Sequence, residues 1–398
     1  MVAGLQASWH HDVSEMAASE WDALIAGQRG SSPFLRHAWL QALSRSACVS
    51  PQTGWRPRIL SLRDGHQRLV GACLLYLKDH SWGEYVFDWA WADAYDRQLA
   101  AGEGGYYPKL VSAVPFSPIP GPRLLTAPAL TSAEHRAIQQ RLLAEVAQAV
   151  ETEKWSSAHL LFLNDVDWEA ARSNGWLIRQ GVQFHWQNRP EQPYLDFDDF
   201  LSSLQRDKRK KIKQERRKVD EAGVNFRILE GADIQPSDWA FFDRCYQQTY
   251  LERGQTPYLS TDFWMRAGES MPSSWVMVQA LEHQTPIASA LLAVDRDHRV
   301  AYGRYWGALK AVSCLHFEAC YYQPLQWCIA NGFQAFEGGA QGEHKLARGL
   351  TPVATHSAHW IRHEGFREAV ARFLQREEVG VASYISELDE RAPFRNAQ

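Results

Sequence analysis

The sequence lacks the cysteine pattern of a disulfide-bonded scaffold, and it lacks the cysteine spacing of a zinc site. Its six cysteines include no Cys-x-x-Cys pair, and 398 residues is long for a disulfide-stapled scaffold. His316 and Cys320 would share one face of a helix, but a zinc site needs two further ligands at credible spacing, and none is seen. We therefore expect reduced, mostly buried thiols and no metal site.

Long apolar runs and a strong excess of one charge are missing as well. No stretch approaches the roughly 20 apolar residues of a membrane-spanning helix, and the N-terminus lacks the basic-then-apolar pattern of a signal peptide. The formal net charge of −4 and the pI near 6.4 argue against a protein that coats nucleic acid, so DNA is not an expected partner. We expect a soluble, cytoplasmic protein with no transmembrane segment.

The chain is rich in aromatic side chains on an otherwise ordinary globular composition. Hydrophobic residues make up 45% and charged residues 22%, and the length suggests about two or three domains. The 17 tryptophans and 14 tyrosines suit substrate sites and large cores alike. Residues 79–93 alternate aromatic side chains with carboxylates, which is typical either of a buried aromatic shelf or of a substrate-facing surface.

The strongest active-site candidate is the glycine-rich stretch 336–349, with the sequence FEGGAQGEHKLARG. Its four glycines let the backbone approach a ligand closely. The side chains between them offer a general base and cations that can hold an anion. The predicted base is Glu337, Glu343 or His344, and the predicted substrate-binding residues are Gln341, Lys345 and Arg348. The alternative is a solvated glycine-rich loop.

The order of elements before this stretch predicts an antiparallel meander, a crossover helix and a parallel strand. These elements are residues 275–281, 287–294, 300–306, 315–330 and 333–337, with Pro324 kinking the helix or marking a junction. Period-two alternation places Tyr302, Arg304 and Trp306 on one face, where they would line a donor channel. His316 and Glu318, on the helix, are further substrate-binding candidates. The alternative for Arg304 is a structural ion pair with Glu318 or Glu337.

A strongly basic helix is expected at residues 198–222. Residues 206–218 hold nine basic and two acidic side chains, with Ile212 and Val219 as the only apolar anchors of the helix. Such a run is either a solvated face or a site for a phosphate-rich ligand, because clustered cations repel one another without an anionic partner. The predicted phosphate-binding residues are Lys208, Arg209, Lys210 and Lys211.

Eight stretches, which lie between Pro33 and Phe394, carry a resemblance to a known family. They are residues 80–93, 106–109, 114–118, 121–125, 183–186, 302–307, 315–318 and 337–349. Together they resemble the FemAB-like family of bacterial proteins (peptidoglycan biosynthesis/recognition, predicted N-acyltransferases), related to the GNAT superfamily. The resemblance implies an α/β fold with mixed sheets in two GNAT-like domains side by side. We expect these domains at residues 1–195 and 196–398.

The resemblance also implies an N-acyltransferase. Fem ligases move an amino acid from aminoacyl-tRNA onto an amino group of a cell-wall precursor, whereas GNAT enzymes use acyl-CoA. Residues 306–314 lack the Arg/Gln-x-x-Gly-x-Gly/Ala loop that holds the CoA pyrophosphate, which favours a tRNA-borne or otherwise phosphate-rich donor.

We therefore expect no tightly bound cofactor, with aminoacyl-tRNA or acyl-CoA as the co-substrate. The acceptor would be an amine of a small molecule or of a cell-envelope precursor, and tRNA is a candidate partner. The alternative function is a non-catalytic binding module for an anionic glycan, a lipid precursor or RNA, since the basic helix and the aromatic residues suit such ligands.

Overall fold

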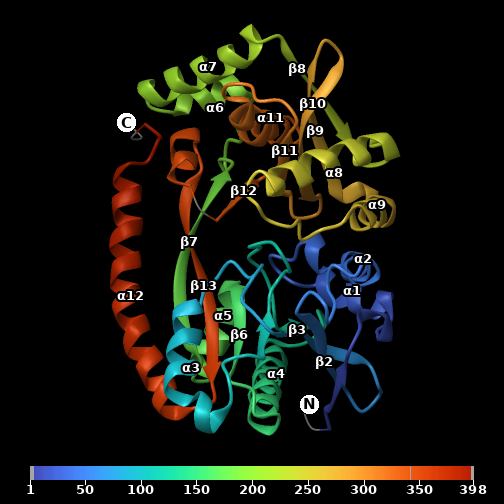
Figure 1. The fold of residues 1–398 in the computed structure, drawn as a ribbon, viewed down its shortest axis with the longest axis vertical. Helices are drawn as coiled ribbons and strands as arrows, with labels where there is room; N and C mark the ends of the chain where they lie inside the picture. Colours follow the sequence, from blue (N-terminus) through green and yellow to red (C-terminus); the bar gives the residue numbers. More distant parts are fainter. Residues whose placement is uncertain (1–3, 341, 396–398) are drawn as a thin grey trace. The chain divides into compact units, whose positions relative to one another are not determined.

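The structure is a computed structural model that describes residues 4–340 and 342–395 (Figure 1). The chain divides into two compact units, Met1–Gly181 with Ala354–Ser383, and Val182–Val353 with Tyr384–Gln398. We call them the N-terminal unit and the C-terminal unit. This division differs from a single cut near residue 196, because residues 354–383 group with the first half of the chain.

The strands of the N-terminal unit form a mixed arrangement. Strands β1 to β4 pair in order as antiparallel neighbours, β4 pairs with β6 in parallel, β6 pairs antiparallel with β13, and β5 pairs with β3. The strands are β1 (Gln6–His10), β2 (Trp55–Arg63), β3 (Leu69–Lys78), β4 (Lys109–Ser112), β5 (Leu125–Thr126), β6 (Ser157–Leu163) and β13 (Thr351–Ile361).

Two sets of helices build the cores of the N-terminal unit. Helix α4 begins with a capping box between Thr131 and Glu134, and it packs on β2, β3 and β6. Helices α3 and α12 share a second core, in which Trp91 and Tyr95 meet Phe366. The helices are α1 (Ala18–Ala26), α2 (His37–Arg45), α3 (Trp89–Glu103), α4 (Ser132–Thr152), α5 (Asp165–Ser173) and α12 (Glu364–Glu390), with short 3-10 turns η1 (Val13–Glu15) and η2 (Pro33–Leu35).

The strands of the C-terminal unit repeat the same pairing pattern. Strands β8 to β11 are antiparallel neighbours, β11 pairs with β12 in parallel, and β12 pairs antiparallel with β7. The strands are β7 (Leu177–Gln187), β8 (Val224–Glu230), β9 (Trp275–Glu282), β10 (Thr285–Asp295), β11 (Val300–Ala308) and β12 (Ala335–Ala340). The predicted meander, crossover and parallel strand are therefore confirmed. The protein is a mixed α/β protein whose two units share one strand-pairing pattern.

One helix of the C-terminal unit departs from the sequence prediction, whereas the crossover helix has the junction that was predicted at Pro324. The single helix expected at 198–222 is wrong, because the chain leaves helical geometry at the buried Leu204, between α6 and α7. The crossover helix is interrupted by a π-helical turn, after which Pro324 falls in the first turn of α11. The elements are α6 (Phe197–Ser203), α7 (Arg206–Glu221), η3 (Gly231–Asp233), α8 (Pro236–Leu251), α9 (Thr261–Ser270), η4 (Pro272–Ser274), α10 (Leu315–Phe317), η5 (Glu318–Tyr322), α11 (Gln323–Ala330) and η6 (Glu343–Arg348).

Two cores flank the strands of the C-terminal unit. Side chains of α6, α7, η5 and α11 share one large cluster with β9, β10 and β12. Elsewhere α8 packs on β10 and β11, where Tyr305 contacts Trp264 of α9 and Tyr246 of α8. Across the described ranges, no helix is long and apolar enough to cross a membrane.

Candidate functional site

The candidate site lies where β11 and β12 stop pairing. Their parallel register runs from Val300–Ala335 to Tyr302–Glu337, while β11 continues to Ala308 and β12 to Ala340. Where two parallel strands separate, their backbone N–H and C=O groups no longer pair with each other. These groups and the nearby side chains can then bind a ligand.

A bulge in β11 sets the direction of the Arg304 side chain. Tyr305 pairs with Leu291 and Gly303 with Leu292, so Arg304 is the extra residue between two consecutive partners. The prediction that Tyr302, Arg304 and Trp306 share one face is therefore wrong. Ala301 and Trp306 contact the same core cluster, which puts Trp306 on the face opposite Tyr302.

Arg304 is held by Glu337 of the neighbouring strand. Its guanidinium donates to the backbone oxygen of Glu337 and, at 3.0 Å, to the side-chain Oε2 of the same residue. The Arg304 side chain is 4% exposed and the Glu337 side chain 12% exposed. Burial raises the pKa of Glu337 to about 7, although the Arg304 charge pulls it down. Glu337 can therefore exchange a proton near neutral pH.

Two glycines form a second bulge, in β12, opposite Arg304. The pairing of β12 with β7 shifts register between Glu337 and Ala340, across Gly338 and Gly339. A Cβ on Gly338 would come within 2.5 Å of the Leu350 side chain. Gly339 has a φ of +78°, and its Cβ position lies 3.6 Å from the Arg304 guanidinium. The absence of side chains here lets the guanidinium approach the backbone of β12.

Lys345 of η6 brings a second cation to this bulge. Its Nζ donates to the backbone oxygen of Gly339 at 3.3 Å, and the residue is 4% exposed. Burial, helped by the nearby Arg304 charge, lowers the pKa of Lys345 to about 7. The site therefore contains a carboxyl and an amine that both titrate near neutral pH, which is the range required for acid–base work.

Sequence reasoning missed two residues of this site, both on β7. His185 lies opposite Glu337 in the strand register, and its Nε2 is 3.0 Å from Oε1 of Gln183. Burial, and then the Arg304 and Lys345 charges, lower the pKa of His185 to about 3, so its ring is neutral. No local pattern could have identified them, because their role depends on β7 pairing with β12.

His344, Arg348 and His316 gather beside the π-helical turn. The hydroxyl of Tyr321 is 3.2 Å from Nε2 of His344, and the ring centres of His316 and His344 are 6.5 Å apart. The pKa of His344 is lowered by burial and by the Arg348 and Lys345 charges. Arg348 is buried and forms an ion pair with Glu215 of α7. His344 and Arg348 lie within three positions of Lys345 in the sequence, and both have protein partners of their own.

Three predicted residues are placed apart from Arg304 or lie outside the described residues. Glu343 is exposed and forms an ion pair with Arg391 at 2.9 Å. Glu318 accepts from Arg216 of α7 at 3.1 Å rather than from Arg304. Gln341 lies outside the residues that the structure describes.

The sequence matches the model of the FemAB-like family, described as peptidoglycan biosynthesis/recognition, over residues 12–396. The chain belongs to the FemAB-like family. No curated protein matches the sequence.

Solved structures show the fold that this FemAB-like chain shares with other proteins. L-PGS from Bacillus licheniformis is 9% identical, with a TM-score of 0.52 over 90% of this chain and 97% of that chain. The C-terminal domain of a protein named as a lysylphosphatidylglycerol synthetase, from Agrobacterium fabrum, is 8% identical, with a TM-score of 0.52 over 90% and 96%. A tandem GNAT protein from the clavulanic acid biosynthesis pathway is 12% identical, with a TM-score of 0.46 over 90% and 98%.

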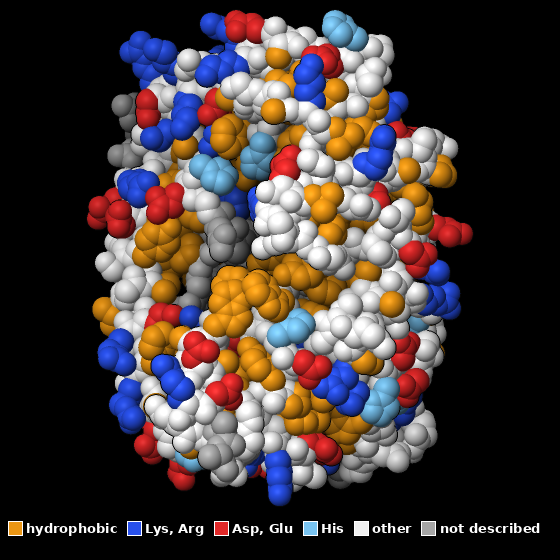
Figure 2. Space-filling view, in the orientation of Figure 1, with side chains coloured by type: hydrophobic (Ala, Val, Ile, Leu, Met, Phe, Trp, Pro, Cys, Tyr) orange, Lys and Arg blue, Asp and Glu red, His pale blue; other side chains and the backbone are white. Residues whose placement is uncertain are grey.

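Helix α7 of the FemAB-like chain presents a row of cations to solvent. Its buried residues are Ile212, Glu215 and Val219, and on the other side the exposed basic residues Arg206, Lys210, Lys213 and Arg217 follow helical spacing. Blue side chains gather over α7 in the upper left of Figure 2. Of the predicted phosphate-binding residues, Lys210 and Lys211 are exposed, Arg209 is half-buried, and Lys208 forms an ion pair with Asp207.

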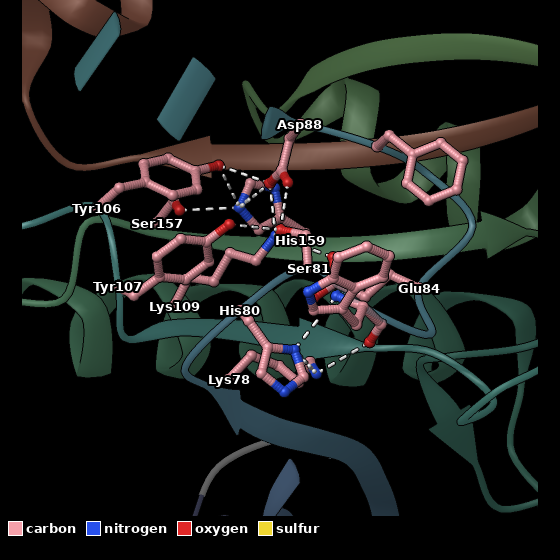
Figure 3. Close-up of polar contacts among 12 residues, drawn as sticks. Lys78, His80, Ser81, Glu84, Asp88, Tyr106, Tyr107, Lys109, Ser157 and His159 are labelled. Carbon is pink, nitrogen blue, oxygen red and sulfur yellow. Dashed lines mark hydrogen bonds and ion pairs between the residues drawn. The ribbon is translucent and has the colours of Figure 1, made fainter. Parts of the chain in front are cut away.

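A second polar cluster lies in the N-terminal unit, around Lys109 (Figure 3). The Lys109 ammonium donates to Ser81 at 2.8 Å, to Glu84 at 2.9 Å and to Asp88. Asp88 also accepts from the hydroxyls of Ser81 and Tyr106. Two of the carboxylates in residues 79–93, Glu84 and Asp88, thus face an internal lysine, and three neighbouring rings remain partly exposed. These rings belong to Trp82, Phe87 and Trp89.

Burial governs the charges of this Lys109 cluster. Burial alone would lower the pKa of Lys109, but the Glu84 and Asp88 carboxylates raise it above its usual range. Burial would raise the pKa of Asp88, but Lys109, His159 and the hydrogen bond from Ser81 together hold it well below its usual range. Burial raises the pKa of Glu84 to about 7 and lowers that of Lys78 to about 7. Residues 4–340 and 342–395 contain no group of three or more His, Cys, Asp or Glu that could hold a metal ion.

Proposed function

We propose that this FemAB-like chain is an acyltransferase that moves an acyl or aminoacyl group from an activated donor onto an amino group. The observation that carries the proposal is the meeting of Arg304, Glu337 and Lys345 at the point where β11 and β12 part. Amide formation needs a base for the attacking amine and positive charge for the oxyanion. This cluster offers both.

In the proposed reaction Glu337 is the general base. The amine nitrogen attacks the carbonyl carbon of the donor and gives its proton to the Glu337 carboxylate, whose pKa of about 7 suits proton transfer at neutral pH. Arg304 and Lys345 stabilise the negative oxygen of the tetrahedral intermediate. The bond to the carrier then breaks with its electron pair, and the leaving sulfur of CoA or ribose oxygen of tRNA takes up the proton that Glu337 holds.

The cation row of α7 supports a phosphate-rich donor. Arg206 and Arg217 are eleven positions apart, which in a helix is about 16 Å, long enough to contact several phosphates. The donor classes are therefore aminoacyl-tRNA and acyl-CoA, of which the first agrees with the sequence of residues 306–314. An aminoacyl donor also agrees with a fold shared with proteins named for lysylphosphatidylglycerol synthesis.

The proposed acceptor is an amine of a cell-envelope precursor or of a small molecule. The family description, peptidoglycan biosynthesis/recognition, supports the first of these. A neutral amine is required for attack, and the neutral ring of His185 adds no positive charge that would repel the amine before it loses its proton.

The test is turnover with defined donors. The purified protein is incubated with acetyl-CoA, with longer acyl-CoAs and with a set of aminoacyl-tRNAs, each with amine acceptors that include lipid-linked peptidoglycan precursors. We expect one donor class to release CoA or deacylated tRNA, with an amide product of matching mass. If no donor is consumed while RNA, an anionic glycan or a lipid precursor binds with salt-dependent affinity, the chain is a binding module instead.

A further inference from the structure

Helix α7 turns one carboxylate inward, although its outer face is cationic. Glu215 is buried between Ile212 and Val219, and its two oxygens accept from one nitrogen of Arg348 at 2.8 and 2.9 Å. The hydroxyl of Tyr322 donates to the same carboxylate. A buried ion pair is stable only when its charged groups and their hydrogen-bond donors hold one arrangement. This pair therefore fixes the positions of the segments that carry Glu215 and Arg348.

Arg348 closes the six-residue segment η6, which carries His344 and Lys345. The segment is flanked by Gly342 and Gly349, both with left-handed backbone geometry. Arg348 donates to the backbone oxygen of His344, and its guanidinium carbon lies 3.5 Å from the centre of the Phe317 ring. Arg348 therefore ties the two ends of η6 together, and Glu215 ties Arg348 to α7.

The next residue of α7 makes a second connection to the same place. Arg216 donates to Glu318 at 3.1 Å, and Glu318 begins the π-helical turn that also carries Tyr321. The Tyr321 hydroxyl reaches His344 at 3.2 Å. Consecutive residues of one helix thus hold both segments that meet at His344, and π-helical turns recur at functional sites.

From this arrangement we propose that Glu215 is a positioning residue, which acts through Arg348 to hold Lys345 at the β12 bulge. The inference rests on the proposed acyltransferase function and deepens it. The two faces of α7 then have separate effects. The outer cations hold the phosphates of the donor, and the inner carboxylate sets the position of the Lys345 amine.

The two faces predict opposite kinetic signatures. Glu215→Gln keeps the shape of the side chain but leaves Arg348 without its counter-charge, so η6 loosens. Because misplacing a reacting group by about 1 Å can cost about 100-fold, we expect kcat to fall about 100-fold with KM for the donor nearly unchanged. Neutralising the outer row, Arg206, Lys210, Lys213 and Arg217, should raise KM for the donor and leave kcat nearly unchanged.

A readout without turnover separates this inference from the proposed function. Hydrogen exchange of the amides of residues 343–350 reports on η6 directly, since the amides of Lys345 and Leu350 donate within this segment. In Glu215→Gln we expect these amides to exchange at least about tenfold faster, while those of α4 keep their rates. Glu221→Gln, which changes an exposed carboxylate on the same helix, should match the wild type.

A milder variant covers the case in which Glu215→Gln does not fold. Tyr322→Phe removes one hydrogen bond to Glu215 without stranding a charge, and the same changes are expected at smaller size. Unchanged exchange of residues 343–350 in the folded variants would overturn the inference, whether or not the protein transfers acyl groups. Faster exchange without turnover on any donor would uphold the positioning of η6 and overturn the acyltransferase function alone.

Discussion

The Lys109 cluster of the N-terminal unit and the Arg304 cluster of the C-terminal unit occupy comparable places in a repeated strand pattern. Lys109 begins β4, which pairs with β6 in parallel, and Arg304 lies in β11, which pairs with β12 in parallel. Both clusters are buried and combine cations with carboxylates. Their chemistry nevertheless differs.

The Lys109 cluster is internally complete. Its lysine has three side-chain partners; the Glu84 and Asp88 carboxylates raise the pKa of Lys109, and the Lys109 charge helps to keep the pKa of Asp88 low. The pairing of β4 with β6 covers three of the four β4 residues, so these strands stay together. Such a network holds the segment 81–88 in place, and the charges of Lys109 and Asp88 change little near neutral pH, whereas Glu84 and Lys78 both have a pKa of about 7.

The Arg304 cluster is arranged to change its protonation. Glu337 and Lys345 both have a pKa of about 7, and two bulges interrupt the strands beside them. The comparison teaches that buried charge by itself does not mark a catalytic site. Groups that titrate near neutral pH, next to strands that part, are the more informative signal.

The largest expected effect is on activity, and it separates the two clusters. Glu337→Gln removes the proposed base and should lower the transfer rate by about 10² to 10⁴-fold. Glu84→Gln alters a carboxyl with the same raised pKa in the other cluster and should leave the rate within about twofold. The measurement is kcat/KM with the donor that supports turnover. A comparable loss in both variants would mean that the Lys109 cluster also takes part in the reaction.

The second effect is on stability, and the larger loss is expected in the Lys109 cluster rather than in the Arg304 cluster. Lys109→Met leaves Asp88 and Glu84 buried without their counter-charge and should cost about 3–5 kcal/mol of unfolding free energy. Lys345→Met removes a buried amine whose charged form is disfavoured by burial, so it should not lower the unfolding free energy. Urea unfolding followed by tryptophan fluorescence compares them, with the surface variant Lys310→Met as control. Equal losses would remove the distinction between the clusters.

Local patterns predicted much of the fold. The meander, the crossover and the capped helix α4 follow from hydrophobic periodicity and from a Thr–Glu pair, which act over a few residues. The break between α6 and α7 could not be predicted in this way. Leu204 forms a bridge with Phe394, and the amide of Gln205 donates to Pro393 at 2.8 Å, so residues almost 190 positions away end the helix.

Only the part of the candidate site that depends on local sequence could be predicted. Glycines followed by charged residues identified the stretch that holds Glu337 and Lys345, because close backbone approach needs glycine. The sequence could not reveal the bulge at Arg304, which depends on its register with β10, or the contribution of His185 through β7. Both depend on partner strands rather than on local spacing.

The third effect is a pH dependence of stability that Lys345 should impose. The pKa of Lys345 is about 7 in the folded protein and about 10.4 when unfolded, so between these values the unfolded chain binds more protons. Stability from this residue therefore rises with pH from about 7 to 10, by at most about 1.4 kcal/mol per unit. Lys345→Met should reduce that rise, whereas Glu84→Gln should not alter it. Urea midpoints at several pH values test this, and an unchanged rise in Lys345→Met would contradict the lowered pKa.

The smallest expected effect compares two glycines with the same backbone geometry. Gly339 at the β12 bulge and Gly175 in the N-terminal unit both have a φ of +78°. Alanine at either position should cost about 1–2 kcal/mol from left-handed strain. Only Gly339→Ala adds a methyl group beside Arg304, 3.6 Å from its guanidinium, whereas Gly175 has no atom within 4 Å of its Cβ position. We therefore expect equal shifts in the urea midpoint but a loss of transfer rate, about tenfold, in Gly339→Ala alone, because the methyl group occupies space that a donor carbonyl needs. If both variants keep the full rate, the backbone of β12 is not the surface on which the donor lies.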